Sequence, residues 1–353
     1  MVDLGPLIEL ARRSELFTAP RLEADLAQFL AERTGLIKAL AAEAVASGVE
    51  HVYFMGCGGS WSNMFSGKYL LDRFTTLSSD VLTSYESIWR NPQRLNTRAW
   101  VFLASYSGGT EDTVAALGHA RDRGARTIAI VRRRDSTMSR EADTVINYDS
   151  TALYSIPLAT VYLFALEIAR LQGHPEAGPA MDGLLALPPV LGQVYRESEA
   201  RAADLARQFA DSSLLYVVAA GPLYGLAYKF ALTVFMENIR IHGSVIESAE
   251  FRHGPVEMLG RQRADMVFLL GTDETRAMTQ RVIDLVRQRD TVRTIVYDMA
   301  DHAGVHPLLA PFVLLIPLQW FTVYSALLAG IHNLDERVFM GRGMLAQGQA
   351  SWP

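Results

Sequence analysis

The sequence predicts an α/β protein made of two tandem domains, each a doubly wound parallel sheet flanked by helices. Three observations predict this fold. Short apolar runs alternate with helical stretches of about 10–15 residues, as in parallel sheets. Two of the runs are followed by glycine-rich turns that lead into helices. Finally, the runs at 266–270 and 294–297 echo those at 101–104 and 127–131, so the pattern repeats after about 165 residues.

The boundaries of the expected parts follow changes in pattern along the chain. Apolar residues near helical spacing predict an N-terminal helical arm. A proline-containing stretch between the two repeats predicts the inter-domain connection. We therefore expect the arm at 1–46, the first domain at 47–175, the connection at 176–200, the second domain at 201–335 and a C-terminal tail at 336–353.

The first domain opens with an apolar run at 49–55, which predicts a buried strand. The turn Gly-Cys-Gly-Gly-Ser follows at 56–60, and a helical pattern occupies 61–74. A second unit has the same order: a strand at 100–104, a turn rich in serine and glycine at 105–110, and a helix at 111–123. Such units are typical of parallel sheets.

The remaining elements continue the alternation in both halves. In the first half we expect further strands at 127–131 and 144–148 and a closing helix at 153–171. In the second half we expect a strand at 214–220 and a helix to about residue 240. The second half lacks the Ser-x-Ser-Gly-x-Thr pattern of the first, so we expect one anion site per chain.

The composition excludes several classes of protein. The chain has 353 residues and a net charge of −5, which argues against a nucleic-acid binder, because binding to phosphate backbones demands clustered Lys and Arg. The single cysteine, Cys57, excludes an internal disulfide framework. The apolar runs at 156–168 and 308–328 are interrupted and predict buried elements, not membrane spans. Because the first residues also lack the features of a signal peptide, we expect a cytoplasmic protein.

The two turns of the first domain predict an anion site. Backbone N–H groups at the amino end of a helix favour an anion, and hydroxyl groups add donors. Ligands of such sheets bind beyond the carboxyl ends of the strands. Helix capping by Ser or Thr is the alternative explanation, but two such turns in one unit favour an anion. The candidate residues are Gly58, Gly59, Ser60, Ser105, Ser107, Gly108 and Thr110.

The segment 237–255 carries the candidate catalytic residues. Glu237 is a candidate base and His253 a candidate acid, with His242 between them. Proton transfer on a sugar needs such a pair. The two lie too far apart for one helix face, but a helix followed by a returning loop would bring them to one cavity. The eight histidines show no metal-ligand spacing with carboxylates, so we expect no metal, and no cofactor is predicted.

These motifs resemble the sugar isomerase (SIS) family, in particular its fructoselysine-6-phosphate and fructosamine-6-phosphate deglycases. The resemblance rests on Gly-Cys-Gly-Gly-Ser, on Ser-x-Ser-Gly-x-Thr-x-Asp-Thr, and on Glu237 followed sixteen residues later by His253 in Glu-Phe-Arg-His-Gly-Pro. It implies that the serine-rich turns hold the 6-phosphate of a sugar, that Glu237 moves a proton between C1 and C2, and that His253 reaches across a dimer interface. The further sugar contacts that it implies are Tyr106, His242, Glu250, Arg252 and His332.

Departures from the family's aminotransferase branch narrow the expected chemistry. That branch uses a lysine in its C-terminal loop and another three residues before its base. Here no lysine follows His332, and Val234 stands three residues before Glu237. An aminotransferase is therefore disfavoured.

Three functions remain open at this point. The first is a deglycase that cleaves a ketosamine 6-phosphate through an enaminol. The second is an aldose–ketose isomerase of a 6-phospho-sugar or a 6-sulfo-sugar such as sulfoquinovose. A sulfonate in place of the phosphate would change the side chains near the turns, and the candidates for such a change are Trp61, Tyr106, Trp89 and Arg90. The third is a non-catalytic sugar-phosphate sensor. In each case we expect a small sugar ligand, a homodimer or a larger assembly of this chain, and neither nucleic acid nor membrane as partner.

Overall fold

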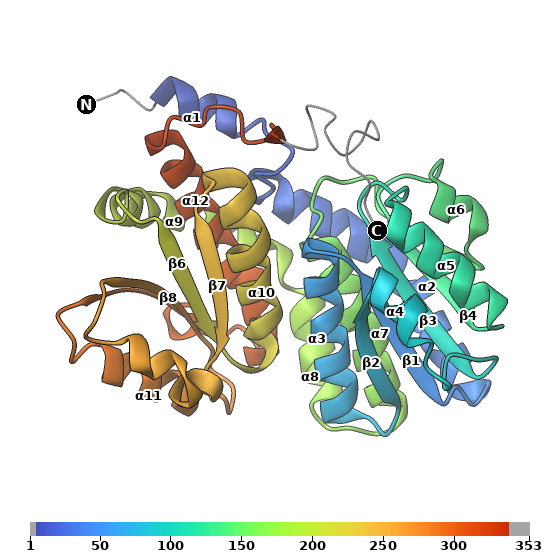
Figure 1. The fold of residues 1–353 in the computed structure, drawn as a ribbon. Coiled ribbons are helices and arrows are strands. Elements are labelled where there is room, and N and C mark those ends of the chain that lie inside the picture. The colour runs from blue at the N-terminus through green and yellow to red at the C-terminus, as the bar shows by residue number, and fades with distance from the viewer. Residues whose placement is uncertain (1–4, 339–353) are drawn as a thin grey trace.

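Two parallel sheets lie side by side, and helices cover their faces (Figure 1). The structure is a computed structural model that describes residues 5–338. The first sheet has the order β2-β1-β3-β4-β5 and the second the order β7-β6-β8-β9. The first comprises β1 (His51–Gly56), β2 (Ser78–Thr83), β3 (Ala99–Ser105), β4 (Arg126–Val131) and β5 (Thr144–Asn147). The second comprises β6 (Leu214–Ala219), β7 (His242–Glu247), β8 (Ala264–Leu270) and β9 (Val292–Asp298).

The helices follow the predicted alternation. The arm contains α1 (Gly5–Ala11) and α2 (Leu22–Ala46). The first half contains α3 (Gly59–Phe74), α4 (Ser84–Arg90), α5 (Glu111–Asp122), α6 (Thr137–Glu141) and α7 (Ser155–Leu171). Next come α8 (Ala177–Leu185), α9 (Pro188–Gln208), α10 (Tyr224–Lys229), the π-helix η3 (Phe230–Ile239), α11 (Arg276–Val286) and α12 (Ala310–Leu328). The predicted α/β class with two parallel sheets is confirmed.

The strands are apolar because both faces of each sheet are covered. Every residue of β1 and β3 is buried, and so is every residue of β8. A strand covered on both faces has no polar side, so its sequence is a continuous apolar run instead of an alternating one. This explains why these runs stand out in the sequence.

Two apolar helices form the centre of the molecule. In α7 every residue from Ser155 to Ala169 is buried, and α12 packs along α9 with Trp320 fully buried. The segment Pro307–Leu328 is long and apolar enough to cross a membrane, but 94% of its most apolar window is buried inside the protein, as in a core helix. Burial of the runs at 156–168 and 308–328 is thus confirmed.

Several elements were not predicted from the sequence. Strands β2 and β7 lie at the sheet edges, and their burial is mixed, so they give no continuous apolar signal. The predicted connection at 176–200 consists of α8 and the first part of α9. The domain boundaries themselves stay a prediction.

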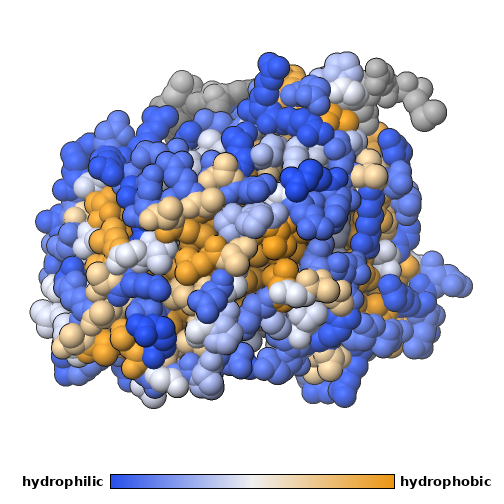
Figure 2. Space-filling model, turned by 180° about the vertical axis from the view of Figure 1, so that it is seen from behind, coloured by the Kyte–Doolittle hydropathy of each residue, from blue (hydrophilic) through white to orange (hydrophobic). Residues whose placement is uncertain are grey.

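The surface is mainly hydrophilic at its margins. Figure 2 shows the face opposite to that of Figure 1, where hydrophobic side chains gather near the middle between hydrophilic borders. Contiguous apolar surface is a feature of protein contacts. The predicted homodimer stays a prediction.

The two halves meet where α10 crosses α3. A Cβ atom on Gly225 of α10 would lie 2.5 Å from the backbone oxygen of Ser62 and 3.3 Å from the side chain of Ser66, both on α3. Around this crossing, the rings of Trp61 and Tyr228 are 4.5 Å apart. Glycine is therefore required for the close approach of the two halves.

We predict that Gly225→Ala lowers the free energy of unfolding by about 1–3 kcal/mol, because the added methyl group meets backbone atoms that have to move. Chemical denaturation measures this change. The matched control is Gly118→Ala in α5, where a Cβ atom meets nothing within 4 Å. There alanine is expected to leave stability unchanged or to raise it by up to about 1 kcal/mol. Equal effects of both substitutions would contradict the proposed close contact.

Candidate active site

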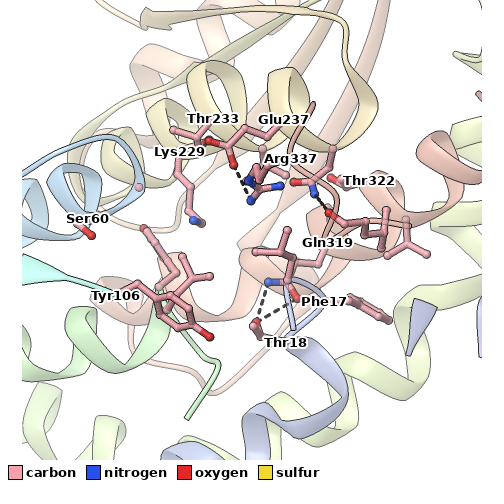
Figure 3. Close-up of a pocket in the computed structure, with 18 of the residues that line it drawn as sticks. Phe17, Thr18, Ser60, Tyr106, Lys229, Thr233, Glu237, Gln319, Thr322 and Arg337 are labelled. Atoms are coloured by element: carbon pink, nitrogen blue, oxygen red, sulfur yellow. Dashed lines mark hydrogen bonds and ion pairs between the residues drawn. The ribbon is translucent and has the colours of Figure 1, made fainter. Parts of the chain in front are cut away.

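A cavity of about 420 Å³ lies between the two halves (Figure 3). Five parts of the chain line it: the arm, the two turns of the first sheet, the residues just before α7, the α10–η3 segment, and α12 with the residues that follow it. The lining residues are Leu16, Phe17, Thr18, Cys57, Gly59, Ser60, Tyr106, Thr110, Leu153, Tyr154, Lys229, Thr233, Val234, Glu237, Asn238, Gln319, Thr322, Val323, Leu334 and Arg337.

The first turn presents the amino end of α3 to the cavity. Gly58 precedes the helix with φ 52°, a conformation that favours glycine. Gly59 and Ser60 then line the cavity. Cys57 lines it too, and its thiol donates a hydrogen bond to Asp112 (Sγ–Oδ2 2.7 Å). Burial, with Asp112 as a second cause, raises the pKa of Cys57, which keeps the thiol protonated.

The second turn is held in shape by its own hydroxyl groups. Ser105 and Thr110 share a hydrogen bond (Oγ–Oγ1 2.7 Å), and Ser105 accepts one from the N–H of Gly108 (3.1 Å). Ser107 accepts one from the N–H of Gly109 (3.2 Å). Thr110 lines the cavity directly, so the turn offers a preorganised set of hydroxyl and amide groups.

Tyr106 extends this turn towards the arm. Its hydroxyl accepts a hydrogen bond from Arg132 (Nη1–Oη 2.6 Å) and donates one to Glu15 (3.3 Å). Burial raises the pKa of Tyr106 to about 12, so the phenol is neutral at physiological pH.

Five of the predicted site residues line the cavity: Gly59, Ser60, Tyr106, Thr110 and Glu237.

Glu237 lies on η3, and its carboxylate is paired with Arg337 (Oε2–Nη2 2.9 Å). Figure 3 shows the pair above the cavity, across from Ser60 and Tyr106. Single-turn or short π-helical segments occur often at functional sites. Within the described part of the chain, Glu237 is the one carboxylate that lines the cavity, and its side chain is 46% exposed.

Lys229, the last residue of α10, also points into the cavity. Burial lowers its pKa to about 8, while Glu237 raises it and Arg337 lowers it further. Its Nζ lies 5.4 Å from the ring centroid of Tyr154. Lys229 was not predicted as a site residue, because it stands eight residues before Glu237 and belongs to no recognised motif.

The other predicted site residues lie outside the cavity within one chain. β7 runs from His242 to Glu247 and carries the chain away from Glu237 before the one-turn helix Glu250–His253. A strand of this length spans about 20 Å. His253 is exposed there and accepts a hydrogen bond from Arg252 (Nε–Nε2 3.0 Å). A strand, not a returning loop, therefore follows η3, and the chain does not bring Glu237 and His253 together by itself.

The predicted sugar contacts of the residues outside the cavity stay predictions. These residues are His242, Glu250, Arg252, His253 and His332, all exposed. Gly58, Ser105, Ser107 and Gly108 shape the two turns without lining the cavity. The predicted tail at 336–353 lies mostly outside the described residues, which end at Val338.

Several lining residues were missed from the sequence. Asn238 donates a hydrogen bond to the backbone oxygen of Leu334 (3.0 Å), which fixes the chain that leads to Arg337. Gln319 of α12 accepts from the N–H of Ala19 (2.8 Å) and so holds the arm over the cavity. These contacts join residues far apart in the sequence, and no local pattern marks them. Within residues 5–338 no cluster of His, Cys, Asp or Glu is arranged to hold a metal ion.

The comparisons with known proteins define the class. The SIS domain profile matches residues 47–169, and relatives more than 30% identical cover most of the chain. The chain therefore belongs to the SIS family, and it is an enzyme of that family.

Individual proteins with more specific names than the family are also similar to this chain. The fructoselysine 6-phosphate deglycase of Escherichia coli K12 is 36% identical over 319 residues, which cover 90% of this chain and 93% of the relative. The fructosamine deglycase FrlB of Bacillus subtilis is 33% identical over 287 residues, 75% of this chain and 84% of the relative. A solved structure of a Bacillus subtilis protein described as a phosphosugar isomerase superposes with a TM-score of 0.77 at 29% identity, covering 86% of this chain and 95% of that one.

We predict that Cys57 reacts slowly with a thiol reagent such as iodoacetamide at pH 8, because its raised pKa leaves little thiolate. Mass spectrometry of the time course measures the rate, and the sequence has a single cysteine, so the signal is unambiguous. The control is the same protein unfolded in guanidinium chloride, where the rate rises to that of a free thiol. A rate in the folded protein equal to or above the unfolded rate would contradict the assignment.

Proposed function

We propose that the protein is a deglycase that cleaves a ketosamine 6-phosphate to glucose 6-phosphate and a free amine. The observation that carries the proposal is the cavity itself: one carboxylate, Glu237, faces two turns that offer hydroxyl and amide donors. The 36% identity to a protein named fructoselysine 6-phosphate deglycase supports this substrate class. The phosphate would lie against Ser60 and Thr110, which line the cavity, at the turn that Ser105 and Ser107 hold in shape.

Glu237 acts on the open-chain ketosamine. Its carboxylate removes a proton from C1, and the electron pair of the broken C–H bond forms a C1=C2 double bond while the C2 oxygen gains a proton. The enaminol then takes a proton at C2, which leaves a protonated imine between C1 and the amine nitrogen. Water adds to C1 and the amine departs, so that glucose 6-phosphate remains. The anchored phosphate keeps C1 near the base throughout.

We predict that Glu237→Gln lowers kcat by about 10²–10⁴-fold, the range that general acid–base catalysis supplies. The amide keeps the size of the side chain but cannot take the proton. Binding of glucose 6-phosphate, followed by calorimetry, is expected to change little. The control is Glu257→Gln, which removes a carboxylate from a one-turn helix away from the cavity. Turnover at the wild-type rate in Glu237→Gln would remove Glu237 from the mechanism.

The reaction class is tested with three substrates: fructoselysine 6-phosphate, fructose 6-phosphate and sulfoquinovose. A deglycase releases lysine from the first in step with glucose 6-phosphate, and in D₂O it introduces deuterium at C2 of the product. The alternative is an aldose–ketose isomerase, a reading favoured by the similarity to a protein described as a phosphosugar isomerase. Interconversion of fructose 6-phosphate or sulfoquinovose with no amine release would establish that alternative.

We further propose that a second copy of the chain supplies His253 as the acid. No histidine lines the cavity among the residues that the structure describes, and His253 is exposed on its own chain, where a neighbouring copy can receive it. The site would then be complete only in a homodimer.

Mixing two inactive variants tests this arrangement. We predict that Glu237→Gln and His253→Gln, each inactive alone, together regain about a quarter of the wild-type activity, because half of the exchanged dimers contain one intact site of two. Unmixed variants are the control. If His253 instead served its own chain, every site in a mixed dimer would carry one substitution and no activity would return.

A further inference from the structure

Lys229 is a buried cation whose charge the fold does not neutralise. The residue is 6% exposed. Within the described part of the chain its ammonium group donates no hydrogen bond and forms no ion pair; it lies over the ring of Tyr154. A buried charge without a partner is costly, and proteins retain such groups mainly where a ligand pairs with them.

The position of this ammonium group is unusual as well. Nζ lies 3.0 Å from the place that a Cβ atom on Gly59 would take, so it stands against the first turn of α3. Figure 3 shows it directed between Ser60 and Tyr106, away from the Glu237–Arg337 pair. The amino end of a helix carries a partial positive charge. A cation and a helix amino end repel each other, and an anion between them would satisfy both.

A third observation points to the same place. Tyr154 lines the cavity beside Lys229, and its fully buried hydroxyl has no hydrogen-bond partner among residues 5–338. An unpaired buried hydroxyl costs free energy unless a ligand or water pairs with it.

We propose that Lys229 is the cationic ligand of the charged group of the sugar, reaching from the second half of the chain to complete an anion site at the amino end of α3. The anion is a phosphate or a sulfonate, and this inference rests on the proposed function for the nature of the sugar. Lys229 makes the site bipartite: the first half supplies amide and hydroxyl donors, and the second half supplies the charge. Gly59 is required there because a larger side chain would displace the ammonium group.

Two charged groups and three neutral titratable groups of the described chain surround Lys229 in the cavity. Glu237 and Arg337 face it from η3 and from the segment after α12, and they are paired with each other. Tyr106, Tyr154 and Cys57 all have raised pKa values and remain neutral. Since burial lowers the pKa of Lys229 to about 8, anion binding weakens as the pH rises through this value, and binding above it takes up a proton.

The experiment compares Lys229→Met, which removes the charge, with Lys229→Arg, which keeps it. Calorimetry measures binding of fructose 6-phosphate and inorganic phosphate between pH 6.5 and 9.5. We expect Lys229→Met to weaken both by on the order of tenfold or more and to abolish the fall in affinity above pH 8. Lys229→Arg is expected to restore phosphate affinity at pH 9.5. The matched control is Lys68→Met, which removes an equal charge from the exposed face of α3, where Lys68 pairs with Asp72 (2.6 Å).

The outcomes separate this inference from the proposed function. Equal phosphate affinity in Lys229→Met and wild type, both shown to be folded by circular dichroism, would overturn the inference. So would a loss of kcat with unchanged affinity, which would place Lys229 at the reacting carbons. Because the pH dependence of wild-type binding is measured without any substitution, a flat profile is a second route to refutation. Lysine-dependent phosphate binding without cleavage of any ketosamine would instead refute the deglycase and leave the inference standing.

Discussion

The crossing of α3 and α10 is the contact on which the active site depends. Gly225 allows the two helices to approach until a methyl group no longer fits, and the ring pairs Trp61–Tyr228 and Phe65–Tyr224 pack on this contact. The crossing fixes the amino end of α3 relative to the end of α10, and so it places Lys229 against Gly59. The π-helix that continues α10 then carries Glu237 over the same cavity. One close helix contact thereby sets both the anion end and the base end of the site.

The two ends of the cavity carry different charged groups. At one end Lys229, the amino end of α3 and the hydroxyl-rich turn after β3 all favour an anion. At the other end Arg337 holds the carboxylate of Glu237. A sugar with one anionic end would place that end at Lys229, because the paired Glu237 and Arg337 offer no net positive charge at the other end. Under the proposed function, this orientation would keep the reactive carbons next to Glu237 and away from the turns.

The sequence predicted those parts of the candidate site whose residues are close together along the chain. The turns at 56–60 and 105–110 were predicted because a buried strand, glycines and hydroxyl residues stand within a few positions of one another. Glu237 was selected through its spacing to His253, and it does line the cavity. Lys229 and Arg337 were missed because their importance arises from contacts with residues about 100 to 170 positions away, which no local pattern expresses. The edge strand β7 was missed because it has no continuous apolar run. Without this strand, the sequence did not predict that Glu237 and His253 are separated.

The separation of Glu237 from His253 limits the proton transfers that a single subunit could carry out. In the proposed reaction a proton leaves C1 and another must reach the C2 oxygen, so a base without an acid would complete only half of the exchange. Among residues 5–338, those that line the cavity include the proposed base but no histidine. The neutral tyrosines and the protonated thiol have raised pKa values, which make them weak acids near pH 7. Because β7 is parallel to β6, it must carry the chain along the full length of the sheet before His253 appears. The topology of the second sheet thus prevents one subunit from placing its own His253 beside its own Glu237. Pairing of subunits would be a catalytic requirement and not only a source of stability.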